Sequence, residues 1–511
     1  MSDAAGPGPT IPPVAGASEQ RDVIVEPTHG ADILDTSEAG PAAIRGGTLR
    51  AGAYALGILL SLVSAPLLIR HLGVTEYGQF VTISSLLFIV TGIVDGGLTN
   101  VGVREYTTLD GEARTEFMRN LLGMRLLVPA LGGVLAVAFS AIAGYSSTLV
   151  IGTAVGAVGV VLLLAGGSFT VPLISKLRAG TVAGLELLRQ VITVAGLIAL
   201  VVAGASLLPF FAVPIVANIP VIVVGFLLVR GQMPMRPTLD VRQWRPILRD
   251  TLPFAAATAL GFVYFRVTVI VMSLVSTAVE TGYFSASFRI VEVLIAVPAM
   301  LVTAAFPILA RAARDDAARL RYALQKLFEV SILCGVGVAL LLIVVAPFAI
   351  DVIAGDKFGP SVPVLRIQAL ALIGTFLVAT WGFALLALRQ HRVLIFTNLA
   401  AMVIAAVATI TLAPSLGAKG GALATTITEW VLPLMYLVAI VRVRPDLRPH
   451  FAVVPKAVAA AGVAAAVALL PGLPSAVGTV VAAVIYIGLL FALRAVPGEV
   501  IDAIPRPARA R

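Results

Sequence analysis

The chain has 511 residues, of which 59% are hydrophobic and 12% charged, and its net charge is +9. Soluble domains carry about 25% charged residues, so this composition excludes an ordinary soluble fold. Segments almost free of charge recur along the whole chain, and about 18 such residues in a row indicate a membrane-spanning helix. These runs are continuous rather than alternating, which excludes a transmembrane barrel. The sequence therefore predicts an all-α polytopic membrane protein.

Residues 1–44 differ from the rest of the chain. They hold seven acidic residues and one base, with many Gly, Pro and Ala and no apolar period. This composition is typical of disorder, and it lacks the basic start and apolar core of a signal peptide. We expect a disordered acidic cytosolic tail here. The single cysteine, Cys334, excludes a disulfide within the chain and a CxxC metal or redox site.

The apolar segments predict about 14 transmembrane helices in two groups of six, followed by a last pair. The first group lies at 49–70, 79–101, 121–143, 148–171, 183–204 and 207–229. The second lies at 251–275, 284–309, 328–350, 362–388, 393–413 and 420–441, and the last pair at 455–471 and 475–494.

Loop charges predict the orientation. With the N-terminus in the cytosol, the loops on the inner side carry most of the arginines, whereas the outer loops hold only Arg70, Lys357 and Lys419. This bias follows the positive-inside rule along the whole chain. It predicts that both ends are cytosolic and that the basic charge needs no nucleic-acid partner.

Six spans, a basic segment and six more spans indicate an internal duplication. TEYGQFVTISSLLF (75–88) and ETGYFSASFRIVEVL (280–294) each follow the first span of a group, and each has an acid, a Gly beside a Tyr, and a Phe. Because both halves start in the cytosol, we expect two six-helix lobes related by a pseudo-two-fold axis along the membrane normal. The predicted domains are the tail 1–44, an N-lobe 45–230, a cytosolic basic linker 231–250, a C-lobe 251–441, helices 13 and 14 in 442–495, and a cytosolic basic tail 496–511.

Four stretches resemble a known family. They are IRHLGVTEYGQF (69–80), DGGLTNVGVREY (95–106), YFRVTVIVMSLVSTAVETGYFSASFRI with FPILAR (264–290 and 306–311), and LGAKGGALATTITEW (416–430). In this order they resemble the polysaccharide (Wzx-like) flippases of the multidrug/oligosaccharidyl-lipid/polysaccharide exporter superfamily. One position departs from the pattern: this chain has Thr268 where many relatives carry an acid two residues after the arginine of the seventh helix. We therefore assign no ion-coupling role to Thr268.

The resemblance implies a bacterial flippase of the cytoplasmic membrane rather than an enzyme. The implied cargo is a polyprenyl-diphosphate-linked oligosaccharide, moved from the inner to the outer leaflet by alternating access for cell-surface polysaccharide synthesis. The implied partners are that cargo and membrane lipids, with a polysaccharide polymerase or glycosyltransferases as further candidates. We expect a monomer without a cofactor, and Na⁺ or H⁺ is the candidate coupling ion.

Four arginines are candidates to bind the diphosphate and glycan. A charged residue at mid-membrane costs about 2.5–3.5 kcal/mol on insertion scales, so it usually faces a cavity or a partner. Arg266 lies deep in the seventh span, and guanidinium binds phosphate oxygens bidentately; the alternative is a structural pair with Glu292. Arg289 stands three residues before Glu292 on one helix face. Arg189 and Arg125 are the other two candidates.

Four carboxylates are candidates for ion coupling or for structural pairing: Asp95, Glu292, Glu429 and Glu186. Asp95 is placed near the outer end of the second span among glycines, where capping and packing are equally good explanations. Glu429 lies ten residues into the twelfth span. Glu186 forms a polar patch with Arg189 and Gln190, for which an interfacial salt bridge is the simpler interpretation.

Two other functions compete with this one. A lipid II flippase, or a cation-coupled multidrug or metabolite antiporter of the same superfamily, would share the fold, although prominent arginines favour an anionic cargo. A membrane glycosyltransferase or polymerase would need acids and long loops on the outer face. The outer loops here are short, and the sequence has no catalytic Ser/His/Asp set and no metal cluster.

Overall fold

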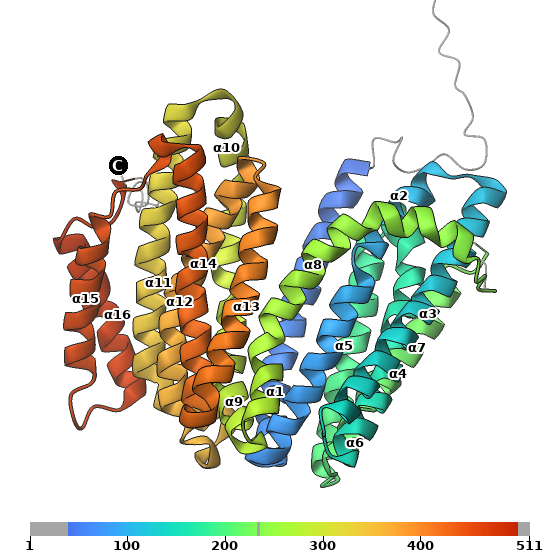
Figure 1. The fold of residues 1–511 in the computed structure, drawn as a ribbon, viewed down its shortest axis with the longest axis horizontal. Coiled ribbons are helices and arrows are strands. Elements are labelled where there is room, and N and C mark those ends of the chain that lie inside the picture. Colours follow the sequence, from blue (N-terminus) through green and yellow to red (C-terminus); the bar gives the residue numbers. More distant parts are fainter. Residues whose placement is uncertain (1–38, 232–235, 499–511) are drawn as a thin grey trace, which may run out of the picture.

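The computed structural model describes residues 39–231 and 236–498, and every regular element within these ranges is a helix (Figure 1). The first half contains α1 (Ala39–Asp95), α2 (Leu98–Thr108), α3 (Gly111–Ile142), α4 (Ser147–Ser175), α5 (Ala179–Val202), α6 (Leu207–Phe210) and α7 (Val213–Leu228). The second half contains α8 (Val241–Val275), α9 (Ala278–Leu294), α10 (Ala296–Asp315), α11 (Ala317–Ala354), η2 (Asp356–Phe358), α12 (Ser361–Ala387), α13 (His391–Leu416) and α14 (Ala418–Val443). The chain then continues through η3 (Pro445–Leu447), α15 (Val453–Ala468) and α16 (Ser475–Ala492).

The helices confirm the predicted fold class. Eleven helical segments of the described residues are long and apolar enough to cross a membrane, and two shorter apolar helices are Ala259–Val275 and Val453–Ala468. The segment Leu59–Thr108 contains two of the predicted spans, and the other segments take one each. Each of the 14 predicted spans therefore has a helical counterpart.

Two predicted boundaries differ from the structure. Helix α1 begins at Ala39, so the last residues of the stretch 1–44 are helical rather than disordered. Helix α8 begins at Val241, so half of the predicted linker 231–250 extends the seventh span. Most of the predicted N-terminal tail and most of the C-terminal tail 496–511 lie outside the described residues.

Helix α1 contains the turn between the first two spans. Gly73 has φ 68° and ψ −175° inside it, a conformation that costs glycine little and other residues more. The chain changes direction there and returns toward α2 (Figure 1). The residues on either side of Gly73 are helical, so the break between the two spans is confined to one residue.

The helices form two bundles that converge at the lower end in Figure 1 and separate toward the upper end. One bundle contains α1 to α7 and the other α9 to α14, with α15 and α16 packed on α11. Helix α8 crosses between them: it packs on α1 and on α13 and also contacts α2 and α3. The two halves therefore meet mainly where α1 lies against α8 and α9.

At the lower end the two repeated turns pack face to face. Gly78 lies in the first turn and Gly282 in the second. A Cβ on Gly78 would overlap the carbonyl oxygen of Ala278, and a Cβ on Gly282 would overlap that of Val74. Such close backbone approach between helices needs residues without side chains. The two copies of the sequence echo thus join the halves at one end of the molecule.

Polar contacts strengthen this junction. Arg70 Nη2 at the end of the first span donates to the carbonyl oxygens of Asp351 (2.7 Å) and Val352 (2.8 Å), near the C-terminus of α11. A cation is favourable at that end of a helix dipole. The hydroxyl groups of Tyr145 and Ser273 share a hydrogen bond of 2.5 Å. Arg70, which loop counting treated only as an outer charge, is therefore a structural tie between the halves.

At the upper end the start of α8 is attached to the first half. Trp244 Nε1 donates to Asn120 Oδ1 at 3.3 Å, and the Thr238 amide donates to the Arg119 carbonyl at 3.1 Å. The residues near 240 are therefore bonded to α3, while the other end of α8 lies against the second half. Helix α8 therefore links the two bundles.

Candidate functional site

A polar cavity of about 250 Å³ lies between the two halves, deep in the helical region. The first half contributes α1 and α5, and the second contributes α8 and α9. The lining is rich in hydroxyl and amide groups and holds two arginines and one glutamate. Its polar residues are Ser61, Ser64, Tyr77, Ser84, Ser85, Gln190, Thr193, Arg266, Ser285, Arg289 and Glu292.

Glu292 joins the two arginines. Arg266 Nη2 donates to Glu292 Oε1 at 2.6 Å, and Arg289 Nη1 donates to Glu292 Oε2 at 2.8 Å. Short distances of this kind are typical of charge-assisted hydrogen bonds. The side chain of Arg266 is only 13% exposed, whereas that of Arg289 is 36% exposed. The structural pair of Arg266 with Glu292 is therefore present, and Arg266 also lines a cavity, whereas its binding of a diphosphate stays a prediction.

Aromatic rings hold Arg266 in place. Its guanidinium carbon lies 4.9 Å from the ring centres of both Phe88 and Phe265, within the range of cation–π attraction. Its Nε is buried and has no hydrogen-bond partner. Arg289 reaches across the junction, where its Nη2 donates to Ser61 Oγ on α1 at 2.8 Å. Arg266 is therefore fixed, and Arg289 ties the halves together through a group that water can reach.

Two guanidinium groups and one carboxylate leave a net charge of +1 among the described residues that line the cavity. A phosphate oxygen that enters the cavity could replace one Glu292 oxygen as the hydrogen-bond acceptor of an arginine. The planar guanidinium group can bind two oxygens of a phosphate at once. The site can therefore accept an anion without leaving an arginine unpaired in the apolar region.

An apolar crevice of about 630 Å³ adjoins this cavity between α1, α9 and α11. Ser61, Ala65, Arg289 and Glu292 line both spaces. The other residues of the crevice are apolar: Pro66, Ile290, Val293, Leu294, Ala296, Val338, Leu341, Leu342, Val345, Ala349 and Ile353. A cationic polar chamber and a large apolar crevice therefore meet at Arg289.

Arg125 and Asp95 lie elsewhere, inside the first half. Arg125 Nη2 donates to Thr99 Oγ1 at 2.6 Å and lies 3.5 Å from Asp95 Oδ1. The Arg125 side chain is 2% exposed and the Asp95 side chain 43%. The placement of Asp95 near the outer end of the second span was wrong, because this span runs back toward α2 and the upper end (Figure 1). Neither residue lines the cavity that contains Arg266.

The polar patch on α5 reaches the cavity through its last member only. Gln190 and Thr193 line the cavity, whereas Arg189 and Glu186 do not. Glu186 is exposed and Arg189 is partly buried. The predicted roles of Arg189 and Glu186 in binding or coupling stay predictions, and the structure gives their neighbour Gln190 the better position.

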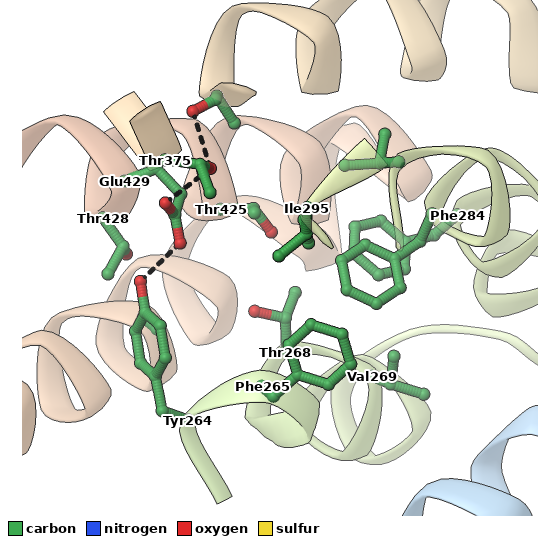
Figure 2. Close-up of a pocket in the computed structure, with 14 residues that line it drawn as sticks. Tyr264, Phe265, Thr268, Val269, Phe284, Ile295, Thr375, Thr425, Thr428 and Glu429 are labelled. Carbon is green, nitrogen blue, oxygen red and sulfur yellow. Dashed lines mark hydrogen bonds between the residues drawn. The ribbon is translucent and has the colours of Figure 1, made fainter. Parts of the chain in front are cut away.

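Glu429 lies in a separate small cavity within the second half, shown in Figure 2. Tyr264 of α8 donates its hydroxyl hydrogen to Glu429 Oε1 at 2.7 Å. The hydroxyl of Thr375 on α12 lies 2.8 Å from Glu429 Oε2. Thr268, at the position where the family pattern has an acid, lines the same cavity. Because Thr268 has no carboxylate, Glu429 is the acidic residue among the described residues that line this cavity.

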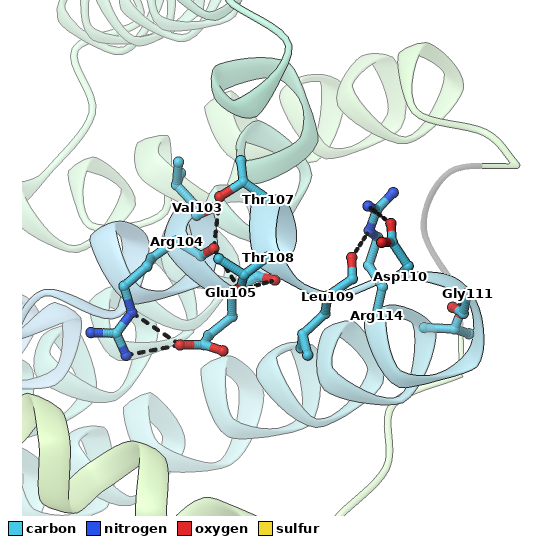
Figure 3. Close-up of polar contacts among 10 residues, drawn as sticks. Val103, Arg104, Glu105, Thr107, Thr108, Leu109, Asp110, Gly111 and Arg114 are labelled. Atoms are coloured by element: carbon cyan, nitrogen blue, oxygen red, sulfur yellow. Dashed lines mark hydrogen bonds and ion pairs between the residues drawn. The ribbon is translucent and has the colours of Figure 1, made fainter. Parts of the chain in front are cut away.

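Several arginines of the upper end serve local structure. Figure 3 shows the turn from α2 to α3, where Arg114 donates to the Leu109 carbonyl through Nε and to Asp110 Oδ1 through Nη2, both at 2.6 Å. After α14, Arg444 donates to both carboxylate oxygens of Asp446 at 2.9 Å. These hydrogen bonds hold the pKa of Asp446 below its usual value. Such pairs fix the loops at this end of the molecule.

The sequence did not identify the uncharged polar residues that line the cavity beside Arg266, Arg289 and Glu292. Ser61 and Ser64 stand three apart on one face of the first span, as do Gln190 and Thr193 on α5. This spacing of polar residues in apolar spans is the signal that could have identified them. Trp381 is 2% exposed and stacks on Phe328 with ring centres 5.5 Å apart, so it belongs to the core.

The family model described as "Polysaccharide biosynthesis protein" matches residues 67–363, more than half of the chain. The chain belongs to this family. The resemblance read from the four motifs is thereby confirmed, and the family match includes α8, α9 and both arginines of the cavity. A comparison with curated protein sequences found no match.

Solved structures show what the fold is similar to. The lipid II flippase MurJ in an inward closed conformation has a TM-score of 0.71 at 14% identity, over 89% of this chain and 100% of that chain. An inward-facing multidrug resistance MATE transporter of the MOP superfamily has a TM-score of 0.64 at 13% identity, over 76% of this chain and 95% of the other. A MOP superfamily transporter from Pyrococcus furiosus has a TM-score of 0.55 at 12% identity, over 82% and 99%. The fold is that of these flippases and transporters.

Proposed function

We propose that this protein is a flippase that moves a polyprenyl-diphosphate-linked oligosaccharide from the inner to the outer leaflet of a bacterial cytoplasmic membrane. The observation that supports this most is that two cavities meet at Arg289. One is cationic and lined by hydroxyl groups, and the other is the apolar crevice. A cargo with an anionic, sugar-bearing head and a hydrocarbon chain matches both. The family description, polysaccharide biosynthesis, supports the same role.

The chemistry of the cavity suits a diphosphate. In the membrane region an anion needs compensation by charge and hydrogen bonds. Arg266 and Arg289 supply two guanidinium groups, and Glu292 keeps them paired when no cargo is present. The serine hydroxyls of α1 and the amide of Gln190 would then meet phosphate oxygens or sugar hydroxyls. No covalent bond needs to form or break, so the protein acts as a transporter and not as an enzyme.

Transport by alternating access would use the junction at the lower end. The halves are held there by the contact of Gly78 with the second turn and by Arg70, and the positive-inside pattern makes that end the outer one. Opening there requires these contacts to separate while the upper ends approach. In this scheme both termini are cytosolic, the protein works as a monomer, and a polymerase or glycosyltransferases would act before or after it on the same glycan.

A lipid II flippase is the second candidate function. The similarity in fold to MurJ extends over 89% of this chain, and a lipid-linked diphosphate would meet the same arginines. The two candidates differ in the sugar and not in the diphosphate or the chain.

The proposal is tested by binding of short isoprenoids to the purified protein in nanodiscs. We expect farnesyl diphosphate to bind well, farnesyl monophosphate more weakly, and farnesol least. Arg266→Ala and Arg289→Ala should each weaken diphosphate binding by about 10–100-fold, since a charge-assisted hydrogen bond contributes about 1.5–3 kcal/mol. Arg392→Ala, which removes an exposed arginine outside the cavity, is the control. Equal affinity for the three ligands, or equal losses in the three variants, would refute the proposal.

A further inference from the structure

A further cavity, of about 230 Å³, lies at the upper end of the second half. Its walls are the first turns of α11, the last turns of α12, and η3 with the segment that follows it. The start of α11 is at the top of the second bundle in Figure 1. In the proposed orientation this end faces the cytosol. The cavity shares no lining residue with the cavity of Arg266.

The floor of this cavity is apolar and belongs to the core. Leu324, Leu447 and Trp381 line it, and all three are buried. The Trp381 ring stacks on Phe328, and Phe451 packs edge-on against Phe328 with ring centres 5.5 Å apart. Close packing of this kind fixes the positions of the rings. The floor therefore has a defined shape without a ligand.

A pair of hydrogen bonds holds one wall of the cavity in place. Gln325 Nε2 on α11 donates to the carbonyl oxygen of His450 at 3.0 Å, and the His450 amide donates to Gln325 Oε1 at 2.8 Å. Both residues line the cavity. The segment after η3 is thus attached to α11 before anything binds, which lowers the cost of ordering it around a ligand.

The rim of the cavity is cationic. Arg321, Arg448 and His450 line it, and no acidic side chain among the described lining residues accompanies them. The nearby carboxylate of Asp446 accepts hydrogen bonds at both oxygens from Arg444, at 2.9 Å. Arg321 lies only within 3.9 Å of Asp446, and its side chain is 56% exposed. The donors of Arg321 therefore remain open to another anion.

Arg448 is open to an anion as well. Within the described part of the chain it makes no ion pair and no side-chain hydrogen bond. Arg321, Arg444 and Arg448 carry three positive charges and Asp446 one negative charge, which leaves +2. Guanidinium groups match the oxygens of a phosphate in geometry as well as in charge. The cavity therefore offers two arginines to a phosphate above an apolar floor.

The level of the cavity indicates where such a phosphate comes from. The predicted span in α11 starts at Phe328, which is about 10 Å from Arg321 at 1.5 Å per residue. This is the level of the lipid headgroups, where basic pockets between helices bind anionic lipids. Tyr322 and Phe451 are exposed beside the cavity, as aromatic residues at a membrane surface commonly are. Helix α15, which follows Phe451, exposes apolar side chains that suit lipid chains.

We infer that this cavity binds the phosphate group of an anionic phospholipid of the inner leaflet. Arg321 and Arg448 bind the phosphate oxygens, and the buried floor packs against the glycerol and the first carbons of the chains. The bound lipid connects α11 with the segment that joins α14 to α15, so it holds the last two helices on the second half. This site does not depend on the identity of the cargo.

The site is tested by native mass spectrometry of the full-length protein in detergent, titrated at physiological ionic strength with phosphatidylglycerol or phosphatidylcholine. One phosphatidylglycerol should bind the wild type more tightly than phosphatidylcholine, whose choline group cancels the negative charge. Arg321→Gln and Arg448→Gln should each weaken it about 10-fold, as the loss of one charge-assisted hydrogen bond implies. Ala318→Trp should weaken it too, because Ala318 lines the cavity and tryptophan fills it without removing a charge. Arg319→Gln is the matched control, since Arg319 is an exposed residue of the same turn outside the cavity.

Three results would overturn the inference. Equal affinity for the two lipids, or an equal loss in Arg319→Gln, would mean a general attraction to a basic surface. Dependence of the tight lipid on Arg266 instead of Arg321 would place it in the cargo cavity. Displacement of the lipid by glycerol 3-phosphate at equal concentration would identify a site for a soluble phosphate rather than for a lipid. Each result is obtained without farnesyl diphosphate, so it is independent of the test of the proposed cargo.

Discussion

Replacing Glu292 with Gln should strengthen the binding of a diphosphate. The change raises the net charge of the described cavity lining from +1 to +2. It keeps the size of the side chain and a hydrogen-bond acceptor for Arg266. A phosphate that contacts both arginines would lie about 6 Å from this carboxylate, where one pair of unit charges interacts by about 3 kcal/mol at an effective dielectric constant of about 20.

Only part of that repulsion is expected in practice. Serine hydroxyls and water screen the cavity, so we take about a third to a half of it, or about 1–1.5 kcal/mol, which is close to a tenfold decrease in Kd. Glu292→Gln should therefore bind farnesyl diphosphate about ten times more tightly, and it should release its cargo more slowly during transport.

The assay is a titration of the protein in nanodiscs with farnesyl diphosphate at fixed ionic strength. Glu186→Gln is the matched control, because it removes the same charge from an exposed position outside the cavity and should leave Kd unchanged. Farnesol should bind both variants as it binds the wild type. Weaker binding to a folded Glu292→Gln protein, or an equal gain for farnesol, would refute the idea that the charge of Glu292 opposes the binding of a phosphate.

Three further predictions concern the scaffold. Gly78→Val should force the lower junction apart and make a cysteine introduced at Ser64, on a Cys334→Ser background, accessible to an impermeant thiol reagent. Gly184→Val, where a Cβ has open space, should not; unchanged accessibility would contradict the role of the packed turns. Asp95→Ala should lower the thermal stability in detergent more than Arg125→Met. It leaves a buried guanidinium without a counter-charge, at a cost of about 3–5 kcal/mol, whereas water reaches the carboxylate that Arg125→Met leaves. A larger loss of stability in Arg125→Met would contradict this. The ion pair with Arg444 lowers the pKa of Asp446, so this pair is fully formed above the usual Asp pKa of about 3.9 and is lost as the pH falls through the lowered value. Amide exchange at η3 should become faster over that range, and in Asp446→Asn the protection of η3 should not change over it.

The membrane spans were predictable because the bilayer imposes their length and composition on the sequence. The apolar runs of α4 and α11 leave few alternatives to a spanning helix. The pair of Arg289 and Glu292 followed from their spacing on one helix face, and it is present. The echo between the two turns indicated a duplication, but it gave no sign that Gly78 and Gly282 pack against each other.

Other features depend on contacts between distant segments, which hydropathy does not encode. The predicted orientation already returned the second span to the cytosolic side, so the side on which Asp95 lies could have been predicted, whereas its pairing with Arg125 from the next helix could not. The hydroxyl groups of Tyr264 and Thr375 change the chemistry of Glu429, yet in the sequence they are ordinary residues of apolar segments. Ser61 is likewise defined as a site residue only by its hydrogen bond with Arg289 across the junction.

The central claim is that the cavity of Arg266 carries a lipid-linked glycan across the membrane. Its most direct test is depletion of the protein in its native host, with polyprenyl-diphosphate-linked oligosaccharide measured by mass spectrometry and its leaflet by an impermeant lectin. We predict that this lipid accumulates in the cytosolic leaflet, that the wild-type protein corrects the defect, and that a well-expressed Arg266→Ala protein does not. Unchanged lipid-linked glycan together with altered sensitivity to cationic drugs would contradict the claim.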